Sequence, residues 1–593
     1  MKDIIKKAIA SSRIQILFFF ILFVKGLAFN IETESIIRHK NPAFYFFYLG
    51  VWFSFISIYI APSYLFNEKG QKIYLIGLNF LVSFALVADL LYYRAFSDFL
   101  SLFLIKQGGN VEGIWSSIFA MLRPRESLYV IDLLVLVPFL LKFKFGLERN
   151  LRLSAVLVVV SILYLSFVNL ALQKVRDRSL FHVVWSPNEM LYNLSPYGYR
   201  IFDGLDYLFE DPPPEIDDAM RARVKSAYEA NWESSSKPYT FGNHEGRNLI
   251  IIQVESLEAF AILAEIEGQE VTPNLNKLLH DSYFFPTIVE QTNLGGSSDM
   301  DLMLNTSLLP IRKGSAFVRF PQNTYRSLPK ALASLGYQSF AVKVDKPNYY
   351  NWAPSLTSIG YDRCYSQNDL KMDEIFPTGL SDASMLRQSL DIIRGMEEPY
   401  LAFLTTMSSH SPFEIPEQVQ RLKIEGPVKG TVLEDYLQAI HYADRSIGDF
   451  VSQLDSEGRL DNTIIMIYGD HTGLNKFFPA EIRAIEPRQS WCIQEIPRTS
   501  ALFYIKGSEG KRMDVTGGQI DLMPTVLQLL GYDLELLKYS AMGRSLFQTE
   551  RDFSYLANGD CIGSFQQSDE DQAKEMIELS DLLIRSSFFG RHK

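Results

Sequence analysis

The sequence has few cysteines and no excess of basic residues. Its 3 cysteines, Cys364, Cys492 and Cys561, are scattered through 593 residues without the spacing of a zinc or redox motif. This number rules out a disulfide framework and leaves at most one bridge. Lysine and arginine total 57 against 68 acidic residues, which gives a net charge of -11. Because no basic surface is implied, nucleic acid is disfavoured as the main partner.

Long hydrophobic runs are confined to the first third of the chain. Five of them approach the roughly 20 residues that cross a bilayer, at about 14–31, 43–66, 73–96, 127–145 and 152–173. The first run lacks a clear small-residue cleavage site, so we do not interpret it as a cleaved signal peptide. Basic residues gather before the first run, at 67–72 and at 142–152. If all five runs span, these segments share the cytoplasmic side. We therefore expect a five-helix transmembrane domain at 1–173 with the rest of the chain outside the cytoplasm.

Ionisable residues occur within these runs at Lys25, Asp89 and Asp132. Such groups usually face the interior of a bundle or extend to an interface. Two interpretations stay open for them: structural pairing, or contact with a lipid headgroup.

We interpret the rest of the chain as a linker with helices at 174–245 and a soluble domain at 246–593. Strands are predicted at 248–254, 338–344, 400–406, 463–468 and 500–505. Helices are predicted at 215–230, 272–280, 325–335, 382–395, 431–455 and 519–530. This alternation is typical of an α/β domain with a mostly parallel central sheet and helices on both faces.

Reactive side chains follow two of the predicted strands. Glu255 comes after one apolar strand, and Asp470 and His471 come after another. Parallel strands place such residues at the carboxyl edge of the sheet, where α/β sites form. Between them, a turn with two glycines exposes the hydroxyl of Ser297. A carboxylate, a hydroxyl and an Asp-His pair outline one divalent metal site with a nucleophile on it.

Each signal has a structural alternative. A carboxylate after a strand is often a helix cap, and Glu258 competes with Glu255 as a ligand. The turn at Ser297 could be a polar turn in which Ser298 and Asp299 cap the next helix, and Ser297 can still be a nucleophile beside that cap. His410 lies in a loop just past a predicted strand, where a histidine is either solvated or catalytic.

These motifs resemble the lipoteichoic acid synthases and related phosphoglycerol transferases of the alkaline phosphatase and sulfatase superfamily. The resemblance covers nearly the whole chain. In the membrane part it rests on Asp89-Leu-Leu-Tyr-Tyr-Arg94 and on the segment from Gly109 to Pro124. In the outer domain it rests on segments in the family order: Val254-Glu-Ser256, Gln291–Asp299, Met303–Pro310, Ser409–Phe413, His441–Asp444, Tyr468-Gly-Asp-His471 and Ile520–Thr525.

The resemblance implies a ligand set and a reaction. Glu255, Ser297, Asp470 and His471 would hold one divalent cation, manganese in the family, with magnesium or zinc as other choices. Ser297 stands where most members have threonine and would be the nucleophile. His410 matches the active-site histidine of the family.

The substrate pocket departs from the family pattern. A family His-Gly-Asp is matched by Lys343-Val-Asp345, and a Phe-Trp-Asn-Arg by Tyr349-Tyr-Asn-Trp352. Trp352 thus replaces an arginine that contacts phosphate, and Lys343 could restore that charge. Asn475 stands where the family has serine. The substrate-binding residues carried over in this way are Lys343, Asp345, Tyr350, Trp352, His410 and Asn475.

We therefore expect a multi-pass enzyme of the bacterial cell membrane. It would transfer phosphoglycerol from phosphatidylglycerol to an extracytoplasmic glycan, glycolipid or polyglycerolphosphate chain. Alternatives are another headgroup such as phosphoethanolamine, a phosphodiester or sulfate ester hydrolase, and a binding protein that keeps the fold. Sulfatases use a modified Cys or Ser in a C/S-x-P-x-R context, and Ser-Asp-Met-Asp after Ser297 disfavours that reading. An intact set of metal ligands disfavours the binding protein.

Overall fold

The computed structural model describes residues 12–33, 43–96, 99–100, 102, 122–176, 180, 187–208, 215–233, 244–347 and 349–590. The chain divides into two compact units, Met1–Glu210 and Asp211–Lys593. The expected linker at 174–245 is shared between them. Helix α8 (Pro187–Leu208) lies in the first unit and α9 (Asp218–Asn231) in the second.

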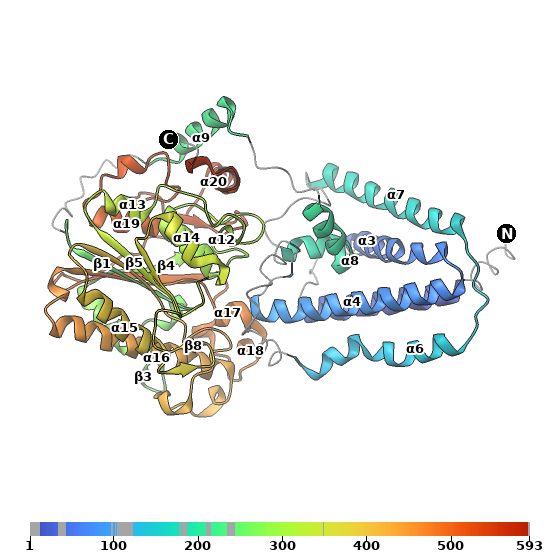
Figure 1. Cartoon of the computed structure of the whole chain (residues 1–593), viewed down its shortest axis with the longest axis horizontal. Helices are drawn as coiled ribbons and strands as arrows, with labels where there is room; N and C mark the ends of the chain where they lie inside the picture. The colour runs from blue at the N-terminus through green and yellow to red at the C-terminus, as the bar shows by residue number, and fades with distance from the viewer. Residues whose placement is uncertain are drawn as a thin grey trace. The chain divides into compact units, whose positions relative to one another are not determined.

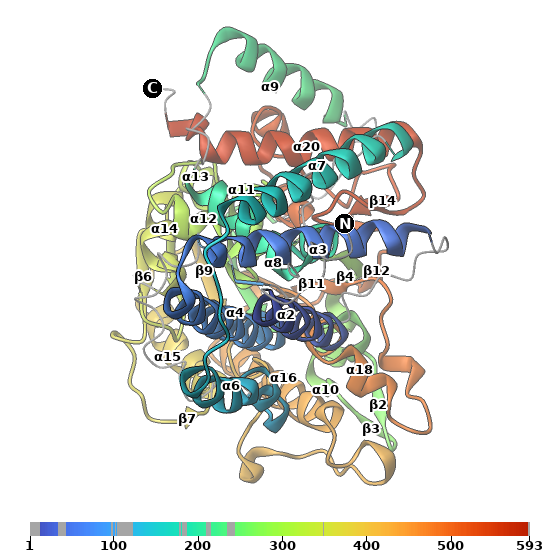
Figure 2. The same cartoon turned by 90° about the vertical axis from the view of Figure 1, so that its right-hand side faces the viewer.

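The first unit is a bundle of apolar helices, coloured blue to teal in Figures 1 and 2. Its principal helices are α2 (Arg13–Glu32), α3 (Ala43–Ile60), α4 (Glu68–Phe96), α6 (Ile131–Lys142) and α7 (Leu151–Arg176). Among the described residues, four helical stretches are long and apolar enough to cross a membrane: Arg13–Glu32, Phe47–Leu65, Glu68–Arg94 and Leu151–Lys174.

The fourth expected span, at 127–145, is not one continuous helix. It is divided between the 3-10 helix η3 (Pro124–Tyr129) and α6, which has 12 residues and contains Pro138. The segment still follows α4 along its length, beside it in both views (Figures 1 and 2). At one end Glu126 pairs with Arg94 at 2.5 Å. At the other end the N–H groups of residues 145 and 146 donate to Glu68 at 2.8 and 2.9 Å. Segment 124–146 therefore runs beside α4 from one end of that helix to the other.

The three ionisable residues within the apolar runs, Lys25, Asp89 and Asp132, are paired. The ammonium of Lys25 donates to Asn79, Ser83 and Asp132 at 2.7, 2.8 and 2.8 Å. Asn79 also donates to the second oxygen of Asp132 at 2.7 Å. Asp89 pairs with Arg200 of α8. All three donors of Lys25 are used, and this favours structural pairing over headgroup contact.

Breaking the Lys25 pair is expected to destabilise the bundle. In Lys25→Ala the Asp132 carboxylate keeps only Asn79 as a partner, and loss of one member of a buried pair costs about 3–5 kcal/mol. The expected result is a clear drop in the melting temperature of the detergent-solubilised protein. Lys69→Ala, at an exposed position of α4, is the control. Equal melting temperatures for the two variants would contradict a structural role.

The second unit is built around a central sheet in the order β12-β4-β11-β10-β1-β9-β5-β6. The strands in this order are β1 (Asn248–Val254), β4 (Ser282–Val289), β5 (Gln338–Val342), β6 (Arg363–Tyr365), β9 (Tyr400–Thr405), β10 (Thr463–Gly469), β11 (Arg498–Ile505) and β12 (Lys511–Arg512). The short strand β13 (Gly517–Gly518) also pairs with β4. Strands β10, β1, β9, β5 and β6 run parallel, whereas β11 is antiparallel to both β10 and β4. The predicted mostly parallel sheet is confirmed.

Strand β4 is absent from the sequence-based prediction, and Pro286 explains the omission. Proline donates no ladder hydrogen bond and argues against an interior strand. The register shows how it is accommodated. Ile288 pairs with Thr499 and Phe285 with Ala501, so two residues of β4 oppose Ser500 alone. Pro286 therefore lies in a β-bulge.

Helices cover both faces of the sheet (Figure 1). Helices α13 (Leu328–Ala333), α14 (Trp352–Ile359) and α19 (Leu522–Leu529) lie on one face, and α15 (Asp382–Arg394) and α16 (Val432–Ser456) on the other. Strands β1 and β10 are buried along their whole length, as strands covered on both sides must be. The polar residues after them can then lie only at the sheet edge.

Candidate active site and metal centre

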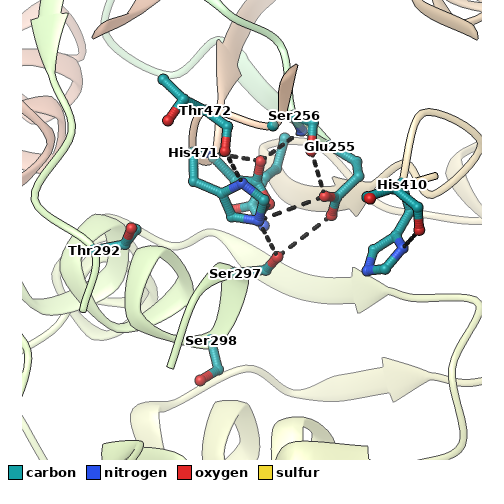
Figure 3. A network of polar contacts seen from close by, with 12 residues as sticks. Glu255, Ser256, Thr292, Ser297, Ser298, His410, His471 and Thr472 are labelled. Atoms are coloured by element: carbon teal, nitrogen blue, oxygen red, sulfur yellow. Dashed lines mark hydrogen bonds and ion pairs between the residues drawn. The ribbon is translucent and has the colours of Figure 1, made fainter. Parts of the chain in front are cut away.

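Neighbouring parallel strands bring the predicted ligands together. Residues 248–254 of β1 pair in register with residues 463–469 of β10, so Glu255 and Asp470 leave the sheet side by side. The donor atoms of Glu255, Asp470 and His471 all lie within 4.8 Å of one another, and all three side chains are buried. Figure 3 shows the side chains of Glu255 and His471 directed toward the same point.

Ser297 faces this cluster from the start of α11 (Ser297–Thr306). Its hydroxyl lies 3.3 Å from the Glu255 carboxylate and 3.3 Å from Nε2 of His471. The preceding Gly296 has φ +52°, a conformation that favours glycine and turns the chain into the helix. The side chain is partly exposed, so a substrate can reach it.

The donor set fits a divalent cation. Oδ1 of Asp470 accepts the N–H groups of Ser256 and His471, each at 2.8 Å. Its Oδ2 is buried and has no hydrogen-bond partner among the described residues. Nδ1 of His471 lies 3.0 Å from the carbonyl of Thr472, so an N–H there leaves the Nε2 lone pair facing the cluster. Carboxylate oxygens with one imidazole nitrogen are ligands that manganese, magnesium or zinc sites use.

The electrostatics of the cluster also favour a cation. Burial, and then the charge of Asp470, raise the pKa of Glu255 to about 8. Two buried carboxylates side by side disfavour each other's ionisation. A divalent cation among them would reverse this effect.

Glu258, the rival ligand, has another role. Its carboxylate accepts the N–H groups of Gly473 and Asn475 at 3.0 and 2.8 Å. It also accepts the side-chain amides of Asn475 and Gln494 at 2.6 and 2.8 Å. Four donors occupy both oxygens, so Glu258 holds the loop after His471. Asn475, predicted to contact substrate, is one of these positioning groups.

The Glu258 carboxyl group should make the stability of the protein depend on pH, and the variant Glu258→Gln should lack this contribution. Burial raises its pKa from 4.5 to about 7. Between these values the folded protein binds the proton more strongly than the unfolded chain, so this group lowers stability as pH rises. The melting-temperature advantage of wild type over Glu258→Gln is expected to shrink between pH 5 and pH 8. A melting-temperature difference between the two proteins that stays constant over this pH range would contradict the raised pKa of Glu258.

His410 lies on the Glu255 side of the cluster (Figure 3). Its Nδ1 is 2.7 Å from the carbonyl of Ser411, so an N–H there leaves Nε2 free to exchange a proton. The neighbouring hydroxyl of Ser409 donates to the carbonyl of Glu255 at 2.6 Å. Asp382 accepts the N–H groups of Met407 and residue 408 at 2.8 and 3.0 Å. The histidine loop is therefore tied to the metal cluster and to α15.

The altered pocket residues take different positions. The indole N–H of Trp352 donates to the carbonyl of Lys346 at 3.0 Å, and the side chain is buried, so Trp352 packs and offers no surface to a substrate. Lys343 is buried and pairs with Asp301 at 2.5 Å. Burial raises the pKa of Asp345, and its other electrostatic neighbours include His410. Tyr350 is partly buried with φ +49°.

Sequence reasoning missed two supporting carboxylates, Asp382 and Glu290. Glu290 follows β4 and accepts the N–H and the hydroxyl of Thr472, both at 2.7 Å. It also accepts Lys476 at 3.1 Å. Burial alone would raise the pKa of Glu290, but Lys476, His471 and hydroxyl donors outweigh it and lower the pKa to about 2. The signal in the sequence was an acidic residue after an apolar strand. It was not recognised because Pro286 argues against an interior strand.

Known proteins share both parts of this architecture. Residues 1–211 match the family model of the lipoteichoic acid synthase N-terminal domain, and residues 247–532 match that of the sulfatases. Lipoteichoic acid synthase 1 of Bacillus subtilis is 31% identical over 557 residues, which cover 92% of this chain and 84% of that protein. The chain belongs to the lipoteichoic acid synthase family.

Further similarities agree with this family. Lipoteichoic acid synthase 2 of Bacillus subtilis is 28% identical over 88% of this chain and 84% of its own length. Two solved structures share the fold. The lipoteichoic acid synthase LtaP of Listeria monocytogenes has a TM-score of 0.53 and 22% identity, covering 62% of this chain and 98% of its own. The lipooligosaccharide phosphoethanolamine transferase A of Neisseria meningitidis has a TM-score of 0.54 and 12% identity, covering 90% and 98%.

Family membership decides the class of protein. This lipoteichoic acid synthase relative is a phosphotransferase enzyme. Its apolar helices, together with the matched N-terminal domain, make it membrane-anchored.

Proposed function

We propose that this family member transfers phosphoglycerol from phosphatidylglycerol to an extracytoplasmic acceptor through a covalent intermediate on Ser297. The acceptor would be a glycan, a glycolipid or a growing polyglycerolphosphate chain. One observation carries the proposal. The Ser297 hydroxyl is partly exposed at a helix start and lies 3.3 Å from both a carboxylate and an imidazole of a buried metal-type cluster.

The first half-reaction follows from this placement. A divalent cation held by Glu255, Ser297, Asp470 and His471, manganese by family resemblance, would supply Lewis acidity toward hydroxyl and phosphate oxygens. The Ser297 hydroxyl releases its proton to solvent as its oxygen forms a bond to phosphorus, and the bond from phosphorus to the diacylglycerol oxygen breaks. The leaving oxygen takes a proton, which protonated His410 would give.

The second half-reaction reverses these roles. An acceptor hydroxyl bonds to phosphorus and His410 takes its proton at Nε2. The bond from phosphorus to Ser297 breaks, and the Ser297 oxygen regains a proton from solvent. Its Nδ1 contact with the carbonyl of Ser411 keeps the ring in the orientation that both steps need. Asp345 and Tyr350 lie on the segment after β5 and are the remaining candidates for headgroup contact.

The same proposal includes a topology. Segment 124–146 follows α4 along its length, so we count it with the four long helices as a fifth crossing. An odd number of crossings and the basic segments at 67–72 and 142–152 support a catalytic unit outside the bacterial cell membrane. There it meets its lipid donor at the membrane surface.

Donor competition tests the proposal. Full-length protein in detergent with manganese is given fluorescent phosphatidylglycerol or phosphatidylethanolamine, with and without a glycolipid acceptor. We expect fluorescent diacylglycerol from phosphatidylglycerol, at a rate that rises with acceptor. Release of diacylglycerol from phosphatidylethanolamine but not from phosphatidylglycerol would show that the transferred headgroup is phosphoethanolamine. Release of diacylglycerol at a rate that does not depend on the acceptor, together with free glycerol phosphate, would identify a hydrolase.

A further inference from the structure

A buried ion pair lies directly behind the proposed nucleophile. Asp301 is one helical turn after Ser297 in α11, and its carboxylate lies 2.5 Å from Nζ of Lys343. The exposed fractions of the two side chains are 0% and 8%. Because Lys343 is buried, little of its ammonium group is left for a second anion. Asp301 is therefore its main electrostatic partner.

The pair belongs to a chain of hydrogen bonds that joins every element of the metal cluster. The second oxygen of Asp301 accepts the amide of Gln253 at 3.1 Å, and Gln253 accepts the hydroxyl of Tyr468 at 2.6 Å. Gln253 precedes Glu255 by two residues on β1, and Tyr468 precedes Asp470 by two on β10. Lys343 adds the end of β5 and Asp301 adds α11. The network thus links the two ligand-bearing strands to the helix that presents Ser297.

We propose that Lys343 is a positioning residue, which neutralises Asp301 and thereby fixes the Ser297 hydroxyl against Glu255 and His471. This inference rests on the proposed function and refines it. Lys343 replaces a histidine of the family motif, and the sequence alone suggested that it meets the donor phosphate. The buried pair assigns its charge to α11 instead. Without it, Asp301 would be an uncompensated buried carboxylate one turn from the nucleophile, and α11 would shift to relieve it.

The two roles predict different kinetics. A positioning residue acts on the geometry of the nucleophile, so Lys343→Met should lower kcat at least about tenfold and change the donor KM less than about twofold. The double variant Lys343→Met/Asp301→Asn removes both charges and keeps an acceptor for Gln253. We expect it to recover much of the lost kcat, because no unpaired charge remains. Lys346→Met, an exposed position on the same segment, is the matched control.

Manganese affinity gives a readout that needs no substrate. Calorimetric titration of the full-length protein in detergent should show weaker manganese binding in Lys343→Met and near wild-type binding in the double variant. The double variant also keeps the test decisive if the single variant folds poorly. A raised donor KM with unchanged kcat, unchanged manganese affinity and no rescue would overturn the positioning role. If wild type itself transfers nothing from phosphatidylglycerol, the proposed function fails while the manganese comparison still decides the role of Lys343.

Discussion

Ser297→Ala is expected to reduce transfer by at least about a thousandfold, as loss of an activated nucleophile does in other covalent enzymes. The fold should survive, because the Ser297 hydroxyl contacts only Glu255 and His471 among the described residues. Ser297→Thr keeps a hydroxyl, as most of the family does, and should retain activity within about tenfold. Rates are compared by diacylglycerol release from phosphatidylglycerol.

The neighbouring serine provides the control for this prediction. Ser298 donates to the carbonyl of Gly295 and meets Ser315 at 2.7 Å. Figure 3 shows its hydroxyl directed away from the metal cluster. Ser298→Ala should therefore change the rate only a few-fold. Full turnover in Ser297→Ala, or an equal loss in both variants, would remove Ser297 from the role of nucleophile.

Asp470→Asn is expected to weaken manganese binding by more than about a hundredfold and to abolish transfer. Changes to groups that merely support a ligand already cost ten- to a hundredfold in affinity. The amide also puts an N–H donor in place of a carboxylate oxygen, where Oδ2 now lies buried and without a partner among the described residues. Metal content after dialysis and calorimetric affinity measure the effect.

Glu258→Gln separates metal ligation from general disturbance of the loop. It alters a carboxylate three residues from Glu255 whose oxygens already accept four donors. We expect it to lower the melting temperature and leave manganese stoichiometry unchanged. Normal manganese affinity in Asp470→Asn, or loss of the metal in Glu258→Gln, would mean that the ligands are misassigned.

The sequence predicted the centre of the site because its signals were local. Apolar strands that end in Glu255 or Asp470 can leave a buried parallel sheet only at the carboxyl edge, and their adjacency in the sheet brings the ligands together. The sequence could not decide whether Glu255 or Glu258 is the metal ligand. Ser256, with φ +55°, turns the chain between them and sends the two carboxylates to different partners. That turn is set by tertiary contacts.

Other residues could not be assigned for the same reason. Whether Lys343 faces a substrate or Asp301 depends on how α11 packs against β5, and no local pattern encodes that packing. Trp352 replaces an arginine in the motif but is buried as a packing residue. In the membrane unit, hydrophobicity located the four runs that form long apolar helices among the described residues. It did not reveal that Pro138 and the polar residues before α6 leave the fourth run with only a short helix.

The most direct test of the covalent mechanism is the intact mass of the full-length protein after acid quenching. The protein is incubated with phosphatidylglycerol and manganese and without acceptor, beside Ser297→Ala and beside a sample given phosphatidylethanolamine. A covalent serine mechanism predicts the added mass of one phosphoglycerol group on wild type, mapped to Ser297 by peptide sequencing and absent from the variant. Diacylglycerol release without any adduct on wild type would contradict it.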